Sequence, residues 1–146
     1  MRAQLRRLRE LKREADALER ELGELVAAQQ PKLLELPGIG VMGAAKLITE
    51  VAGIERFSSP AKLARMAGVA PVPASSGATH RHRLDRGGNR QLNAALHRMA
   101  ITQVRCHRPA QDYVARKIAS GKTKREAIRC LKRQLVRTVF KTMQPA

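Results

Sequence analysis

Apolar side chains recur at alternating spacings of three and four through the first thirty residues of the chain. The series consists of Leu8, Leu11, Ala15, Leu18, Leu22 and Leu25. Charged residues fill most of the gaps, which is the pattern of a heptad seam. It predicts a coiled-coil arm over residues 1–30 whose stripe is buried by a partner helix, so we expect a homo-oligomer. The alternative is one amphipathic helix that packs on its own chain.

A short helix, a tight turn and a second helix are predicted over residues 33–51. The turn reads Leu-Pro-Gly-Ile-Gly and is followed by apolar residues at helical spacing. This is the pattern of a helix-hairpin-helix, in which Gly38 and Gly40 let the backbone approach a phosphate. The free amides at the start of the second helix would add an anion site. A purely structural hairpin is the alternative, because this segment carries no surplus of positive charge.

Two helices with local start signals are predicted in the middle of the chain. Ser59 caps the first and Pro60 takes its first position, while Gly-Gly-Asn at 87–89 starts the second. Between them, the segment 79–84 has the pattern of one short strand or half of a hairpin. The second helix has an apolar face made of Leu92, Ala95, Leu96, Met99 and Gln103 or Val104.

Two further helices complete the pattern. Pro109 opens the first, Gly121 ends it, and Thr123 with Glu126 forms a capping box at the start of the last. The predicted inward face of the first comprises Tyr113, Val114 and Ile118. That of the last comprises Ala127, Ile128, Leu131, Leu135, Val139 and Phe140.

The expected fold is therefore mainly α. A length of 146 residues suits one domain with an appendage, so we assign the arm to 1–30 and a basic helical domain with at most one short β-hairpin to 31–146. Cys106 and Cys130 lack metal-ligand spacing and fall in helical patterns, so we expect both to be reduced and packed as small apolar residues. No apolar run approaches the roughly 18 residues that a membrane span needs. These features predict a cytoplasmic protein without membrane contact.

The net charge of +17 is concentrated in one part of the sequence. Residues 1–55 hold nine basic and nine acidic side chains, whereas twenty basic side chains face three acidic ones after position 55. Such a field attracts phosphate backbones and releases their counterions, so nucleic acid is the expected partner and nonspecific polyanion binding the alternative. One face of the last helix is predicted to contact phosphates rather than only solvent: Lys124, Arg125, Arg129, Lys132, Arg133 and Arg137.

A serine pair lies between an extended segment and a row of arginines. Pro71 and Pro73 exclude a helix, and Gly77 after Ser75 and Ser76 permits a sharp turn that exposes a hydroxyl. The guanidinium groups that follow are expected to bind phosphate: Arg81, Arg83, Arg86 and Arg90. Residue types alone leave an ordinary turn in a basic loop as the alternative to a nucleophile. By proximity in sequence, the proton acceptor would be His80, His82 or Asp85.

Other chemistries lack the necessary residues. The three aspartates form no carboxylate cluster for paired Mg²⁺ ions. The four histidines have no cysteines at zinc spacing, and no phosphate-binding Walker loop is present. We therefore expect no metal and no cofactor in this chain.

Several separate motifs in order resemble the C-terminal domain of insertion-sequence transposases of the 110/116/902 family. They are Leu-Pro-Gly-Ile-Gly at 36–40, Phe-Ser-Ser at 57–59, Ala-Gly-Val-Ala-Pro at 67–71, Ser-Ser-Gly at 75–77, Arg-Gly-Gly-Asn-Arg at 86–90 and Leu-Asn-Ala-Ala-Leu at 92–96. The likeness covers about residues 33–143. In that family, a coiled coil joins this domain to an N-terminal RuvC-like domain with four acidic residues.

The resemblance implies that Ser76 is the nucleophile that joins covalently to DNA, with Ser75 the less favoured neighbour. It also implies a structured guide RNA as partner, and Mg²⁺ only in the RuvC-like domain. This sequence begins at the arm and lacks those acidic residues, so we expect the chain to be inactive in DNA cleavage on its own. The alternatives are a non-catalytic helix-hairpin-helix module that has kept only its affinity for nucleic acid, and an architectural partner in a ribonucleoprotein.

Overall fold

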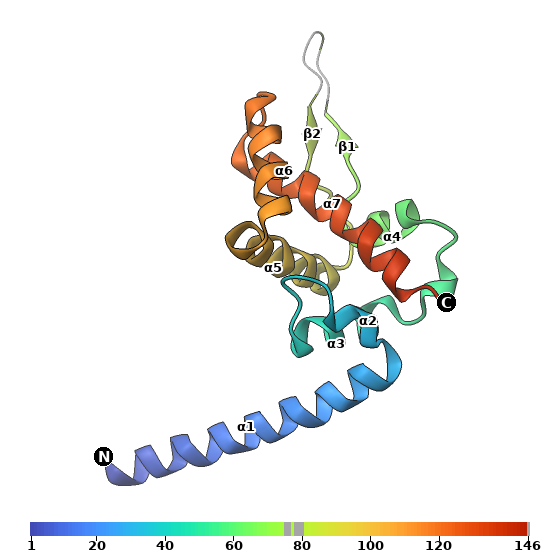
Figure 1. Ribbon diagram of the computed structural model, residues 1–146. Coiled ribbons are helices and arrows are strands. Elements are labelled where there is room, and N and C mark those ends of the chain that lie inside the picture. The colour runs from blue at the N-terminus through green and yellow to red at the C-terminus, as the bar shows by residue number, and fades with distance from the viewer. Residues whose placement is uncertain (75–76, 78–80, 146) are drawn as a thin grey trace.

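The computed structural model describes residues 1–74, 77 and 81–145. Over these residues it contains seven α-helices, one 3-10 turn and two short strands, which confirms the mainly α fold. None of the helices within the described ranges is long and apolar enough to cross a membrane. In Figure 1 the N-terminal helix and the two strands extend from opposite sides of a helical body.

The N-terminal arm is a single helix, α1 (Arg2–Gln29). Only its C-terminal end packs against the body: Val26 is buried, and Gly23 lies against the side chain of Val41. The rest projects outward (Figure 1). The leucines of its apolar stripe remain exposed at Leu8, Leu11, Leu18 and Leu25. The helix over 1–30 is thus confirmed, and its pairing with a second helix stays a prediction.

The segment after the arm holds four short elements. They are α2 (Pro31–Leu34), α3 (Val41–Val51), η1 (Ile54–Arg56) and α4 (Pro60–Met66). The predicted cap of α4 is confirmed, because the Ser59 side chain accepts a hydrogen bond from the Lys62 amide. Phe57 is buried beside this helix in the common core.

Three longer helices form most of the body: α5 (Arg90–Cys106), α6 (Arg108–Ala119) and α7 (Lys124–Met143). They pack against one another, α3 packs on α5, and α4 packs on α7. The capping box at the start of α7 is present as predicted, since Thr123 and Glu126 exchange hydrogen bonds. The predicted buried face of α7 is also confirmed: Ala127, Ile128, Leu131, Leu135, Val139 and Phe140.

Three side chains lie elsewhere than predicted. Ile118 was expected inside but is exposed, because it falls in the last turn of α6, beyond the buried Val114. Cys106 was expected to pack as an apolar residue, yet it is exposed at the end of α5 and only Cys130 is partly buried. Lys132 was expected on the exposed basic face of α7 that contacts phosphates, but only 5% of it is exposed.

The two strands, β1 (Val72–Pro73) and β2 (His82–Arg83), pair antiparallel with Val72 opposite Arg83 and Pro73 opposite His82. The Ala74 amide extends the pairing by donating to the Arg81 carbonyl at 2.8 Å. We call residues 72–74 and 81–83 the β ribbon. Strand β2 lies within the predicted segment 79–84, and Gly77 has a φ of 57°, as the predicted sharp turn requires.

Candidate nucleic-acid interface

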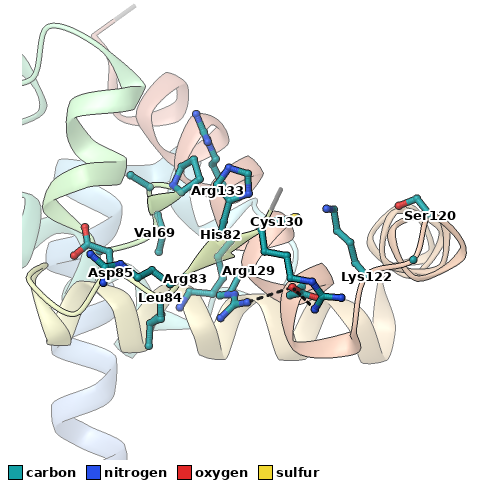
Figure 2. Close-up of a pocket in the computed structure, with 17 residues that line it drawn as sticks. Val69, His82, Arg83, Leu84, Asp85, Ser120, Lys122, Arg129, Cys130 and Arg133 are labelled. Atoms are coloured by element: carbon teal, nitrogen blue, oxygen red, sulfur yellow. Dashed lines mark ion pairs between the residues drawn. The ribbon is translucent and has the colours of Figure 1, made fainter. Parts of the chain in front are cut away.

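A pocket of about 440 Å³ lies between the foot of the β ribbon and the N-terminal half of α7. Its walls come from four parts of the chain: residues 68–71, residues 81–85, the turn at 120–122 and the side chains of α7. Figure 2 shows these side chains converging from the ribbon and from α7. Segments far apart in the sequence therefore form one concave surface.

The pocket is strongly basic. Two acidic side chains, Asp85 and Glu126, lie among its described lining residues. The basic lining residues are Arg81, Arg83, Lys122, Arg129, Lys132 and Arg133. Each guanidinium group can donate two parallel hydrogen bonds to the oxygens of a phosphate. A surface with several of them can therefore bind a polyanion.

Glu126 connects the ribbon to the start of α7. Its carboxylate accepts from the Thr123 amide at 2.8 Å and the Thr123 hydroxyl at 2.9 Å. It also lies 3.6 Å from the Arg81 guanidinium and 4.0 Å from that of Arg129. The Thr123 amide, then the Thr123 hydroxyl, then Arg81 and Arg129 lower the pKa of Glu126, which therefore stays ionised. The Arg81 side chain is still 60% exposed, so it remains accessible to a ligand.

Lys132 also lines this pocket. Its Nζ donates a hydrogen bond to Oδ1 of Asn93 on α5. The Asn93 amide in turn donates to the carbonyls of Ala67 at 2.9 Å and Gly68 at 3.1 Å. Burial lowers the pKa of Lys132, and the nearby Arg129 adds to this. None of the ion pairs within the described residues involves Lys132.

The Arg-Gly-Gly-Asn turn at 86–89 packs against Gly68 and so positions the part of the pocket lined by residues 68–71. We call this part the back wall. Gly88 touches Gly68 so closely that a Cβ at position 88 would lie 2.2 Å from the Gly68 nitrogen. Asn89 caps α5 by accepting from the amides of residues 91 and 92. Its own amide donates to Glu50 at 2.7 Å, and this bond, followed by that from Lys46, lowers the pKa of Glu50. The turn therefore joins α3, α4 and the start of α5.

The structure brings together some of the predicted phosphate-binding residues. Arg81, Arg83, Arg129, Lys132 and Arg133 share the pocket described above. Arg86 lines a second hollow of about 490 Å³, which shares Arg83 with the first pocket. The predicted residues that line neither hollow but are exposed are Arg90, Lys124, Arg125 and Arg137.

The two hairpin glycines lie away from this pocket, on the side of α3. Gly38 packs on α5: a Cβ there would lie 3.1 Å from both the Gln103 side chain and the Met99 carbonyl. Gln103 supports the turn by donating to the Pro37 carbonyl at 2.7 Å. Gly40 is exposed at the N-cap of α3, where an added Cβ would meet no described atom within 4 Å. The role of both glycines in phosphate binding stays a prediction.

The predicted nucleophile Ser76, its neighbour Ser75 and the acceptor candidate His80 lie outside the described residues. Of the other acceptor candidates, His82 is exposed on β2 and Asp85 accepts from the Gly87 amide at 2.9 Å. Across residues 1–74, 77 and 81–145, no three His, Cys, Asp or Glu side chains form a group that could hold a metal ion.

Three residues that line or support the pocket were not predicted from the sequence in these roles. Lys122 follows Gly121, whose φ is 87°, and this turn directs the chain back past the ribbon. Asn93 holds Lys132, and Glu126 pairs with Arg81 in addition to its predicted capping role. The only signal for Asn93 was its place in a family motif, since its partners are distant in sequence.

Comparison with known proteins gives a consistent result. The model of the "Transposase IS116/IS110/IS902 family" matches residues 30–115. The chain is 37% identical over 127 residues to an uncharacterized 43.6 kDa protein of insertion element IS110 from Streptomyces coelicolor, a match that covers 85% of the chain and 31% of the relative. It is 28% identical over 141 residues to an uncharacterized 42 kDa protein of insertion element IS900 from Mycobacterium paratuberculosis, covering 89% and 35%. The chain thus spans about a third of the length of these relatives.

Proposed function

Because the chain belongs to the IS116/IS110/IS902 family of transposases, we propose that it is the DNA-binding, serine-bearing part of an enzyme that moves an insertion sequence. The basic pocket at the foot of the β ribbon carries the proposal. It gathers six Lys or Arg side chains on a concave surface, and in the sequence Ser75 and Ser76 fall between residues 72–74 and 81–83 of the ribbon. We propose that a DNA strand bound in this pocket is the strand that the serine attacks.

The arginines act on the phosphate backbone rather than on the bases. Arg81, Arg83 and Arg129 present guanidinium forks that hydrogen-bond phosphate oxygens. The chain holds only three aromatic residues, so stacking of bases is a minor contribution. Sequence selection then comes from another source, for which the family resemblance suggests a structured guide RNA.

The serine supplies the covalent step. The Ser76 oxygen attacks the phosphorus of a backbone phosphodiester and gives its proton to a base. One P–O ester bond breaks, and the leaving oxygen departs as a hydroxyl after it takes a proton from the protonated base or from water. The phosphoserine bond conserves the energy of the phosphodiester, so strand exchange requires no nucleotide hydrolysis. In this proposal, guanidinium groups of the basic pocket stabilise the charge that develops on the phosphorus oxygens. Metal-assisted steps belong to the RuvC-like domain that the resemblance implies.

Pairing of protomers through α1 is part of the same proposal. Its exposed stripe includes Leu8, Leu11, Leu18 and Leu25, while the helix projects from the body with only its end packed. Most of the stability of an amphipathic helix comes from packing of its apolar face, so α1 is stabilised when a second helix buries the stripe. A paired arm would bring two serine-bearing domains to one DNA junction.

A test of the serine uses the chain together with a separately supplied RuvC-like domain and a labelled DNA junction. Denaturing gel electrophoresis measures the covalent protein–DNA adduct. We expect an adduct with the native chain and with Ser75→Ala, and none with Ser76→Ala. Equal adducts from the two variants would reject Ser76 as nucleophile. Tight DNA binding without any adduct would favour the non-catalytic binding module.

A further inference from the structure

We propose that Lys132 forms the floor of a subsite that holds one phosphate of the nucleic-acid backbone, with Arg129 and Arg133 at its rim. This inference rests on the proposed nucleic-acid-binding function and goes beyond it. It assigns the tightest contact of the basic surface to a side chain that lies almost wholly inside the fold.

The position of Lys132 on α7 is unusual for a cation. Its neighbours on the same stripe, Ile128, Leu131, Leu135 and Val136, belong to the hydrophobic core. Only 5% of Lys132 is exposed, yet the residue lines the 440 Å³ pocket. A lysine needed only for solubility would occupy the opposite face of this helix, as Lys141 does.

The hydrogen bonds of Lys132 leave donors for a ligand. An ammonium group has three N–H donors, and the described protein atoms accept one of them, at Oδ1 of Asn93. Asn93 is held in this orientation by the carbonyls of Ala67 and Gly68. The asparagine therefore fixes the amine beside the pocket. A phosphate, which has only acceptor oxygens and a negative charge, matches the remaining donors.

The charges around Lys132 favour an anion. Arg129 and Arg133 lie on its own helix, and His97, whose pKa burial and then Lys132 lower, approaches it from α5. Asp85, on the loop after β2, lines the same pocket but forms none of the described ion pairs. A buried cation without a carboxylate partner destabilises the fold. A phosphate would remove that penalty, and the low local dielectric strengthens the attraction.

The test compares Lys132→Met with Lys141→Met, an identical change at an exposed position of α7. Fluorescence anisotropy measures affinity for a 20-base-pair DNA duplex, and circular dichroism measures the melting temperature without DNA. We expect Lys132→Met to weaken binding about tenfold to a hundredfold, with a melting temperature equal to or above that of the native chain. Lys141→Met should weaken binding less than about threefold.

The possible outcomes distinguish failure of the Lys132 subsite from failure of the proposed nucleic-acid binding. If the native chain binds the duplex and the two variants bind alike, the subsite is rejected and nucleic-acid binding stands. If Lys132→Met loses affinity and stability together, the lysine is structural and the subsite is again rejected. If the native chain does not bind the duplex, the proposed function itself fails.

If Lys132→Met does not fold, an NMR measurement on the native chain tests the subsite instead. In ¹⁵N-lysine-labelled protein, NMR detects the Nζ signal of each ordered lysine. DNA should shift the Lys132 signal, assigned from Lys132→Arg, more than the Lys141 signal. An unmoved Lys132 signal in DNA-saturated protein would overturn the subsite.

Discussion

A methyl group added at Gly88 tests the contact that holds the back wall of the pocket. The Cβ of an alanine there would lie 2.2 Å from the Gly68 nitrogen, 2.3 Å from its Cα and 2.9 Å from the Ala67 carbonyl carbon. All three atoms are backbone, so no flexible side chain can move aside. The start of α5 must instead separate from the end of α4, which strains the bond from Asn93 to the Gly68 carbonyl.

These distances indicate how much stability the Gly88→Ala variant should lose. Overpacking of a tight site destabilises a fold by about 1–3 kcal/mol, and a backbone obstacle places Gly88→Ala near about 3 kcal/mol on that scale. For a chain of this size, this corresponds to a fall in melting temperature of roughly 10 °C. Urea unfolding measures the change in the free energy of unfolding, and thermal melting measures the change in melting temperature. Both are followed by circular dichroism.

Gly87→Ala is the matched control, because a Cβ at Gly87 meets only the Asp85 carboxylate at an ordinary 3.5 Å. We expect this variant to stay within about 1 kcal/mol of the native chain. Equal stability of the Gly88 and Gly87 variants would refute the reasoning. Loss of stability in both would mean that the whole turn, rather than the contact with Gly68, is responsible.

Two more predictions concern α7 and α1. The pKa of Glu126 is lowered in the folded chain, so its stabilising contribution is complete above about pH 4.5 and is lost as the pH falls through the lowered value. Glu126→Gln should therefore be less stable at pH 7 and lose less stability between pH 5 and 2, as urea unfolding at each pH will show; parallel curves for both proteins would contradict this. Leu18→Glu on α1 should weaken self-association at least tenfold in analytical ultracentrifugation, because it places a charge in the exposed stripe. The exposed Glu24→Gln serves as control, and an unchanged association constant for Leu18→Glu would reject pairing through α1.

Local signals in the sequence predicted the helices well. Ser59, Thr123 with Glu126 and the Gly-Gly-Asn turn mark helix starts through bonds to residues within three positions, so no tertiary information is required. The heptad spacing likewise predicted α1 as one continuous helix. Its exposure could not be predicted, because a stripe looks the same whether it faces the body or a second chain.

Contacts between segments that are far apart in the sequence could not be predicted from it. Lys132 carries the charge pattern of a solvated face, but the packing of α4 and α5 against α7 encloses it. The contact between Gly68 and Gly88 joins residues twenty positions apart, and the bond from Gln103 to Pro37 spans 66 positions. The arginines were recognised from composition, whereas their convergence with Lys122 in one pocket depends on how the ribbon crosses α7.

The most direct test of the account is the salt dependence of DNA binding. Replacing Arg81, Arg83 and Arg129 by glutamine removes three pocket charges, while the control replaces the exposed Arg6, Arg7 and Arg9 of α1. The slope of log affinity against log salt concentration for a DNA duplex counts the phosphates that are neutralised. We expect the pocket variant to lower the magnitude of this slope by about 2.7, at about 0.9 per phosphate contact, and the α1 variant to leave it within about 0.5 of the native value. Equal slopes for the native chain and the pocket variant would contradict binding of DNA at the foot of the ribbon.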